Sequence, residues 1–151
     1  MIKQPLISII IPVYNASEHL EQCLESVLGQ SYQALQVLCI DDFSTDNSLE
    51  ILYRYAQIDE RVKVITKQNE GVSLARNLAL DNICGEYVLF VDSDDWIEPN
   101  MVECMLSVLE EQQADICACG IFYEYPQKTS IREVDSFVGS PTETYKRLYD
   151  E

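Results

Sequence analysis

Basic side chains are scarce in this sequence. Its 151 residues include ten Lys and Arg against 26 Asp and Glu, which gives a formal net charge of −16. So much negative charge repels nucleic-acid backbones and anionic membrane surfaces, and we therefore expect no nucleic-acid partner. An anionic substrate would need a mediator, because a divalent cation is the usual bridge between carboxylates and a phosphate.

Long apolar runs are also missing. No stretch approaches the roughly 20 apolar residues that a membrane-spanning helix requires. Residues 1–6 contain a lysine and a proline, and the apolar run that follows has only the length of a strand, so we recognise no signal peptide. We expect a cytoplasmic protein, with any membrane attachment in regions outside this sequence.

Paired cysteine motifs are a third absence. The six cysteines, at positions 23, 39, 84, 104, 117 and 119, lack the CxxC spacing of a zinc site and fall mostly in apolar stretches. Cys117 and Cys119 would share one face of a strand, where core packing is a more frequent role than metal ligation. We expect buried free thiols.

The sequence does contain five apolar runs that predict strands, at residues 6–11, 37–40, 62–65, 87–91 and 115–121. Between them, apolar residues recur at helical spacing, and Pro99 is typical of the first position of the last such helix. This alternation predicts an α/β fold with an open, mostly parallel, Rossmann-like sheet and helices on both faces. After Phe122 the pattern weakens, with a further helix predicted to start in residues 142–151.

A polar cluster follows each of the first four predicted strands. The clusters are Pro12-Val13-Tyr14-Asn15, Asp41-Asp42, Gln68-Asn69-Glu70-Gly71 and Asp92-Ser93-Asp94-Asp95. In an open parallel sheet, ligands bind outside the carboxyl ends of the strands. We therefore expect all four clusters to lie at one edge of the sheet and to form a binding site there.

The cluster Asp92-Ser93-Asp94-Asp95 is the strongest candidate for a metal site. Three carboxylates this close repel one another, and a bound cation relieves the repulsion. Mg²⁺ or Mn²⁺ prefers carboxylate oxygens together with phosphate and water. The alternative is a solvated turn, in which Asp and Ser are common. A calcium-binding loop is excluded, because its glycine and its later glutamate are not at their positions.

The other clusters leave their alternatives open. Asp41 and Asp42 serve equally well as helix caps or as acceptors for a base or a ribose hydroxyl. The backbone after Gly71 offers free N–H groups, with Arg76 one turn further on, and both suit a phosphate. Arg76 would otherwise pair with one of the many acids. Tyr14 either stacks on a base or covers the first strand.

Five stretches, in this order, match one known family. They are SIIIPVYN (8–15), LESVLGQSY (24–32), IDDFSTD (40–46), NEGVSLARN (69–77) and GEYVLFVDSDD (85–95). Over about residues 5–120 the sequence resembles family 2 of the glycosyltransferases, inverting enzymes with the fold called GT-A. The resemblance implies transfer of a sugar from a nucleotide-diphosphate sugar, usually a UDP-sugar, to a hydroxyl of a glycan or lipid-linked acceptor. The implied process is polysaccharide or cell-surface glycan synthesis.

The resemblance also implies roles for individual residues. One of Asp41 and Asp42 would contact the base, and Asp92-Ser93-Asp94 would be the family's Asp-x-Asp motif. The predicted ligands of Mn²⁺ or Mg²⁺ are Asp92, Asp94 and Asp95, with Asp92 also nearer the ribose or sugar. The predicted donor-binding residues are Pro12, Val13, Tyr14, Asn15, Asp41, Asp42, Asn69, Gly71, Arg76, Asp92 and Ser93.

The sequence departs from the family pattern in two places. Phe43 stands where the family usually has glycine, and the acidic motif that supplies the general base is expected beyond Glu151. We therefore expect a donor-binding domain in residues 1–120 and an incomplete start of the acceptor-side half in 121–151. The rival hypothesis is a glycosyltransferase-like domain that binds a nucleotide-sugar or a partner without transfer. A nicotinamide-binding domain is disfavoured, because no glycine follows the first strand.

Overall fold

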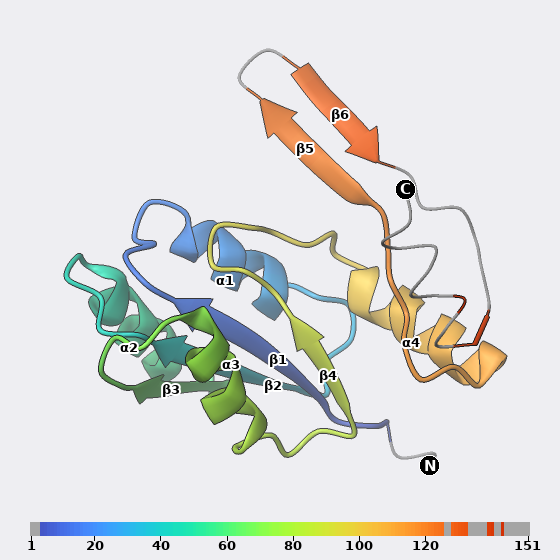
Figure 1. Ribbon diagram of the computed structural model, residues 1–151, viewed down its shortest axis with the longest axis horizontal. Helices are drawn as coiled ribbons and strands as arrows, with labels where there is room; N and C mark the ends of the chain where they lie inside the picture. The colour runs from blue at the N-terminus through green and yellow to red at the C-terminus, as the bar shows by residue number, and fades with distance from the viewer. Residues whose placement is uncertain (1–3, 126–127, 133–138, 141–142, 144–151) are drawn as a thin grey trace. The chain divides into compact units, whose positions relative to one another are not determined.

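The computed structural model describes residues 4–125, 128–132, 139–140 and 143. The chain forms two compact units, Met1–Met101 and Val102–Glu151 (Figure 1). The first unit alternates strands and helices: β1 (Ile7–Val13), α1 (Leu20–Leu28), β2 (Leu35–Asp41), α2 (Ser48–Ile58), β3 (Val62–Thr66), α3 (Val72–Leu80) and β4 (Tyr87–Phe90). The predicted strands at 6–11, 37–40, 62–65 and 87–91 are confirmed within one to two residues at each end.

The sheet of the first unit has the order β3-β2-β1-β4, and every neighbouring pair is parallel. β1 pairs with β2 along its whole length, from Ile7 opposite Leu35 to Val13 opposite Asp41. All seven residues of β1 are buried. A strand between two neighbours and under helices on both faces favours apolar residues, which explains the run Ile9-Ile10-Ile11. The predicted α/β fold is confirmed.

Helices cover both faces of this sheet (Figure 1). On one face, Ile10, Leu38 and Ile40 pack against the small side chains of Ala75 and Ala79 from α3. Alternate residues point to the other face, where α1 and α2 lie, and there burial, followed by the nearby Cys23 of α1, raises the pKa of Cys39 of β2. Fully burying each of these aliphatic side chains contributes about 1.5–3 kcal/mol to the stability of the folded state. The ends of the strands therefore project from a well-packed core.

Gly85 lies where β4 meets the start of β1. Its N–H donates to Ser8 Oγ at 2.9 Å. A Cβ added at this position would lie 2.6 Å from Ser8 N and 2.7 Å from Leu6 O, and these backbone atoms have no room to move. The approach of β4 to β1 therefore requires glycine.

We expect Gly85→Ala to destabilise the fold by about 1–3 kcal/mol, because the methyl group forces β4 away from β1. Urea unfolding of the variant, followed by circular dichroism, measures this loss. Glu86→Ala, an exposed neighbouring side chain, is the matched control and should unfold close to wild type. Equal midpoints for the two variants would contradict the proposed clash.

The second unit contains α4 (Met101–Gln112) and a hairpin of β5 (Ile121–Tyr125) and β6 (Lys128–Arg132). The predicted fifth strand at 115–121 is wrong, because residues 115–120 form no strand and β5 pairs antiparallel with β6 in a separate sheet. A strand needs a neighbour to bond its backbone, and among the described residues β1 is the sole partner of β4. Pro99 precedes α4 by two residues and does not begin it. The helix predicted within 142–151 lies, except for Glu143, outside the described residues.

The cysteine prediction is correct for two positions and wrong for others. Cys23 and Cys39 are buried, whereas Cys84, Cys104 and Cys119 are exposed and Cys117 is half-buried; all are free. Burial, followed by the charges of nearby aspartates, raises the pKa of Cys23 to about 12. The exposed thiols lie in or beside apolar stretches, and an apolar pattern alone does not tell which of its positions face solvent. Within the described part of the chain, every helix is too short or too polar to cross a bilayer.

Candidate functional site

A pocket of about 560 Å³ opens at the carboxyl edge of the sheet. Its walls come from the connections that follow β1, β2, β3 and β4, as the position of the polar clusters predicts. The lining residues are Pro12, Val13, Tyr14, Asn15, Ala16, Glu18, His19, Asp42, Asn69, Gly71, Val72, Ala75, Arg76, Asp92, Ser93 and Asp94. The structure thus brings together every predicted site residue except Asp41 and Asp95.

The connections after β1 and β2 are fastened to each other. Asp42 N donates to Val13 O at 2.8 Å, which extends the strand pairing by one step. Beyond it, Asn15 N donates to Ser44 Oγ at 3.0 Å and Thr45 N donates to Asn15 Oδ1 at 2.7 Å. Asn15 and Phe43 both have positive φ, 51° and 66°. These bonds hold one wall of the pocket in a fixed shape.

Asp46 adds a second tie between the same connections. Its carboxylate accepts the N–H of Ser17 at 3.0 Å and that of Ser48 at 2.9 Å. Burial opposes ionisation, but hydrogen bonds from Ser48 and Ser17 outweigh it and hold the pKa of Asp46 well below its usual range. The carboxylate is therefore charged at neutral pH and serves to position the loops rather than to bind a ligand.

Asp42 is the most heavily bonded side chain of the pocket. Lys67 Nζ lies 2.7 Å from its Oδ1, and the N–H groups of Glu70 and Gly71 donate to the same carboxylate at 3.0 and 2.8 Å. Only 6% of the Asp42 side chain and 10% of the Lys67 side chain are exposed. Burial raises the pKa of Asp42, but these hydrogen bonds lower it further than burial raises it. Asp42 therefore anchors the connection from β3 to α3.

Asp41 lies outside the pocket. Its buried carboxylate accepts the N–H of Ser44, which lies 3.3 Å from each of the two oxygens. Asp41 thus caps the turn that follows β2. Of the two adjacent acids, Asp42 is therefore the one that lines the pocket.

The connection from β3 to α3 ends at Gly71, which has a φ of 94°. Glycine adopts this backbone conformation readily, whereas other residues are strained in it. α3 begins at the next residue, and Leu74 N and Ala75 N both donate to Gly71 O. Among the described residues, the N–H groups of Val72 and Ser73 have no acceptor, as in the first turn of any helix. Val72 lines the pocket together with Arg76, and Ser73 follows it in the same turn.

The acidic cluster continues directly from β4, since Val91 N donates to Ile10 O at 3.0 Å. The Asp92 carboxylate pairs with Arg76, whose Nη2 lies 2.6 Å from Oδ1. The guanidinium also stands 5.8 Å from the centre of the Phe90 ring. Arg76 Nε is buried and, within the described residues, has no hydrogen-bond partner. A buried donor without an acceptor is costly, and an anionic ligand would satisfy it.

Asp94 and Asp95 remain exposed on the turn after Asp92, which is closed by Asp95 N donating to Asp92 O at 3.0 Å. Burial, then the charges of Asp94 and Asp92, raises the pKa of Asp95. In the part of the chain that the structure describes, no three acidic, His or Cys side chains form a metal-ligating group. Mg²⁺-like ions are typically held by one or two carboxylates with phosphate and water, and this donor set fits that pattern.

Lys67, Glu18 and His19 belong to the site or support it, but they were not predicted from the sequence. Lys67 directly follows β3. A basic residue at a strand end, in a sequence with few basic residues, could have indicated that Lys67 belongs to the site. Glu18 and His19 lie before α1 and line the pocket. Their isolated polar pattern resembles that of any solvated helix start, and only the folded backbone places them here.

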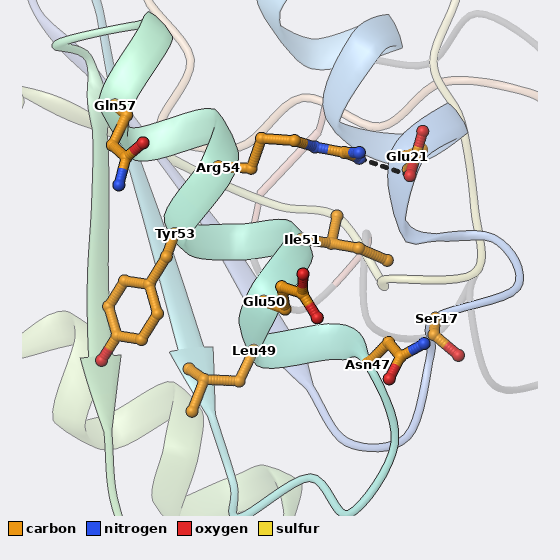
Figure 2. A pocket seen from close by; sticks show the side chains of 9 residues that line it. All are labelled: Ser17, Glu21, Asn47, Leu49, Glu50, Ile51, Tyr53, Arg54 and Gln57. Atoms are coloured by element: carbon orange, nitrogen blue, oxygen red, sulfur yellow. Dashed lines mark hydrogen bonds and ion pairs between the residues drawn. The ribbon is translucent and has the colours of Figure 1, made fainter.

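A second and larger pocket, of about 870 Å³, runs along α2 toward α1 (Figure 2). Arg54 of α2 pairs with Glu21 of α1 across it. Its lining residues are Ser17, Glu21, Asn47, Leu49, Glu50, Ile51, Tyr53, Arg54 and Gln57. None of them is a predicted site residue, and all but Ser17 and Asn47 lie on α1 or α2. We therefore assign the functional site to the smaller pocket.

Residues 8–150 match the family model described as glycosyl transferase family 2. The chain belongs to this family. It is 42% identical over 125 residues to Glycosyltransferase GlyA of Streptococcus pneumoniae, covering 83% of this chain and 18% of GlyA. It is 34% identical over 149 residues to Putative glycosyltransferase EpsH of Bacillus subtilis, covering 97% of this chain and 43% of EpsH. This family 2 chain thus spans less than half of either relative.

Two solved structures resemble this family 2 member. TarS 1–349 of S. aureus, in complex with UDP-GlcNAc, has a TM-score of 0.63 and 32% identity over 72% of this chain and 32% of that one. The mannosyltransferase PcManGT of Pyrobaculum calidifontis, in complex with GDP-Man and Mn²⁺, has a TM-score of 0.64 and 25% identity over 79% of this chain and 35% of that one. The expected GT-A fold is confirmed.

Proposed function

We propose that the chain binds a nucleotide-diphosphate sugar, specifically a UDP-sugar, in the smaller pocket at the carboxyl ends of the strands, the strand-end pocket. The observation that carries this proposal is the composition of that pocket. An acidic turn, a buried Arg76 nitrogen without an acceptor and free N–H groups at the start of α3 line or adjoin one cavity. The complexes of TarS with UDP-GlcNAc and of PcManGT with GDP-Man and Mn²⁺ support the same ligand class.

The proposal assigns the two ends of the ligand to two parts of the sheet edge. The diphosphate would lie by Arg76 and the first turn of α3, because a guanidinium and free backbone N–H groups both donate hydrogen bonds to anions. The base would lie by Tyr14, Asp42 and Asn69. Asp94 and Asp95 would hold Mn²⁺ or Mg²⁺, with Asp92 nearer the ribose or sugar. We assign donor binding to residues 1–120 and the start of the acceptor side to 121–151.

In the proposed reaction, the hydroxyl of a glycan or lipid-linked acceptor would attack the anomeric carbon with inversion and displace the nucleoside diphosphate, in polysaccharide or cell-surface glycan synthesis. A bound divalent cation would neutralise the charge of the departing diphosphate, which would lower the barrier by roughly several kcal/mol. Among the described residues, we assign none as the base that takes the hydroxyl proton. The cytoplasmic location expected from the sequence stays a prediction.

We expect UDP with Mn²⁺ to raise the melting temperature of the chain, while UDP with a chelator does little. A ligand at about 100 times its Kd stabilises the folded state by about 2.7 kcal/mol, which is roughly 5–10 °C for a chain of this size. Thermal melts with UDP, GDP or no nucleotide, each with Mn²⁺ or chelator, test this. The absence of a shift with every nucleoside diphosphate and metal would overturn the proposal.

A further inference from the structure

Phe43 is unusual in both its backbone and its side chain. Its φ of 66° lies in the left-handed region, which bulky side chains rarely occupy. Phe43 is 62% exposed, so its side chain gains little from burial. Neither conformational preference nor core packing explains a phenylalanine here, and strained residues that persist tend to cluster at ligand sites.

The surrounding bonds explain how the strained conformation is maintained. On one side of Phe43, Asp42 N donates to Val13 O at 2.8 Å. On the other side, Ser44 Oγ accepts Asn15 N at 3.0 Å and Thr45 N donates to Asn15 Oδ1 at 2.7 Å. The backbone is fixed on both sides, so the position of Phe43 on the β2 connection is fixed as well.

This position lies beside the pocket wall. Asp42, the preceding residue, lines the pocket, and so does Asn15, which is bonded to the two residues that follow Phe43. Tyr14, the other exposed aromatic on these two connections, is 52% exposed and lines the pocket as well. Phe43 does not line the cavity itself, so its ring can contact only the part of a ligand that extends past Asp42 and Tyr14.

The order of the strands decides which part of the ligand that is. Arg76 and the acidic turn, which suit the diphosphate, pair at the end of β4, and Phe43 follows β2, two strands away in the order β2-β1-β4. Neighbouring strands are about 4.8 Å apart, so about 10 Å of sheet edge separate the two positions. A base has an aromatic face that stacks on a ring, whereas a phosphate has none.

We propose that Phe43 is an affinity determinant for the donor, through contact of its ring with the nucleobase. This inference rests on the proposed function. It makes Phe43 and Tyr14 two aromatic contacts at the base end of the pocket, and it gives a reason for a bulky residue at a position where the backbone favours glycine.

The test is isothermal titration of wild type, Phe43→Gly, Phe43→Asn and Phe43→Tyr with UDP and Mn²⁺, and with pyrophosphate and Mn²⁺. Gly and Asn both tolerate positive φ and lack the ring, so we expect each to bind UDP about tenfold more weakly and pyrophosphate as wild type does. Phe43→Tyr keeps the ring and should keep the affinity for UDP. Phe43→Gly should also melt a few degrees higher, because the backbone strain is relieved.

Tyr53→Ala is the matched control, because Tyr53 is 49% exposed and lines the other pocket (Figure 2). It should bind UDP as wild type does. UDP binding unchanged in Phe43→Gly and Phe43→Asn would overturn the inference, and so would an equal loss for pyrophosphate, which would assign the effect to loop shape. Failure of wild type to bind UDP would instead reject the proposed function.

Discussion

Replacing Asp94 with asparagine is expected to abolish the stabilisation of the chain by UDP and Mn²⁺. Asp94 lines the pocket with an exposed carboxylate, while the carboxylate of Asp92 is already engaged by Arg76. With so few protein ligands, loss of one charged oxygen donor removes a large share of the metal affinity. Thermal melts should show the shift of roughly 5–10 °C in wild type and none in the variant.

Glu50→Gln is the matched control for Asp94→Asn. It removes one exposed negative charge from the wall of the other pocket and leaves the strand-end pocket intact (Figure 2). Its response to UDP and Mn²⁺ should equal that of wild type. A full metal-dependent shift in Asp94→Asn would show that the ligand assignment is wrong.

Lys67→Met is expected to lower the melting temperature of the chain by roughly 5–10 °C at neutral pH. The change leaves the buried carboxylate of Asp42 without its counter-charge, and unpaired buried charges are strongly destabilising. Lys63→Met, at an exposed position of the preceding strand β3, makes the same chemical change without a buried partner and should cost little. Similar losses in the two variants would argue against the Lys67–Asp42 pair.

The effect of Lys67→Met should depend on pH. In wild type the pKa of Asp42 is lowered, so its ionised form stabilises the fold above about pH 4, the usual pKa of an unfolded aspartate. That stabilisation is lost as the pH falls through the lowered pKa of the folded state. Lys67, which also pairs with Glu70, supplies the positive charge at this carboxylate, so removing Lys67 removes part of the lowering, while the N–H bonds from Glu70 and Gly71 remain. The deficit of the variant should therefore be largest near pH 7 and should shrink below about pH 4.

The sheet and the place of the site could be predicted because both depend on local patterns. Runs such as Ile9-Ile10-Ile11 suit only a strand buried on both faces, and parallel strands place their following residues at one edge. The partners within the site could not be predicted. Lys67 with Asp42 and Arg76 with Asp92 are separated by 25 and 16 residues, and nothing in the local sequence selects them among 26 acids. The fifth strand failed for a related reason, since a strand depends on a neighbour that its own sequence does not specify.

The ion pair of Arg76 with Asp92 joins the two side chains that a donor and its cation would each need, Arg76 for the diphosphate and Asp92 for the cation. On the proposed function, an incoming diphosphate must compete for Arg76 with a carboxylate that is already attached to the same fold. If a cation bound at this cluster drew Asp92 toward itself, the guanidinium of Arg76 would be released for the diphosphate, so the cation would strengthen nucleotide binding. Linkage requires the nucleotide to strengthen cation binding by the same factor. Nucleotide and metal would then bind as one cooperative unit, each weakly alone and tightly together.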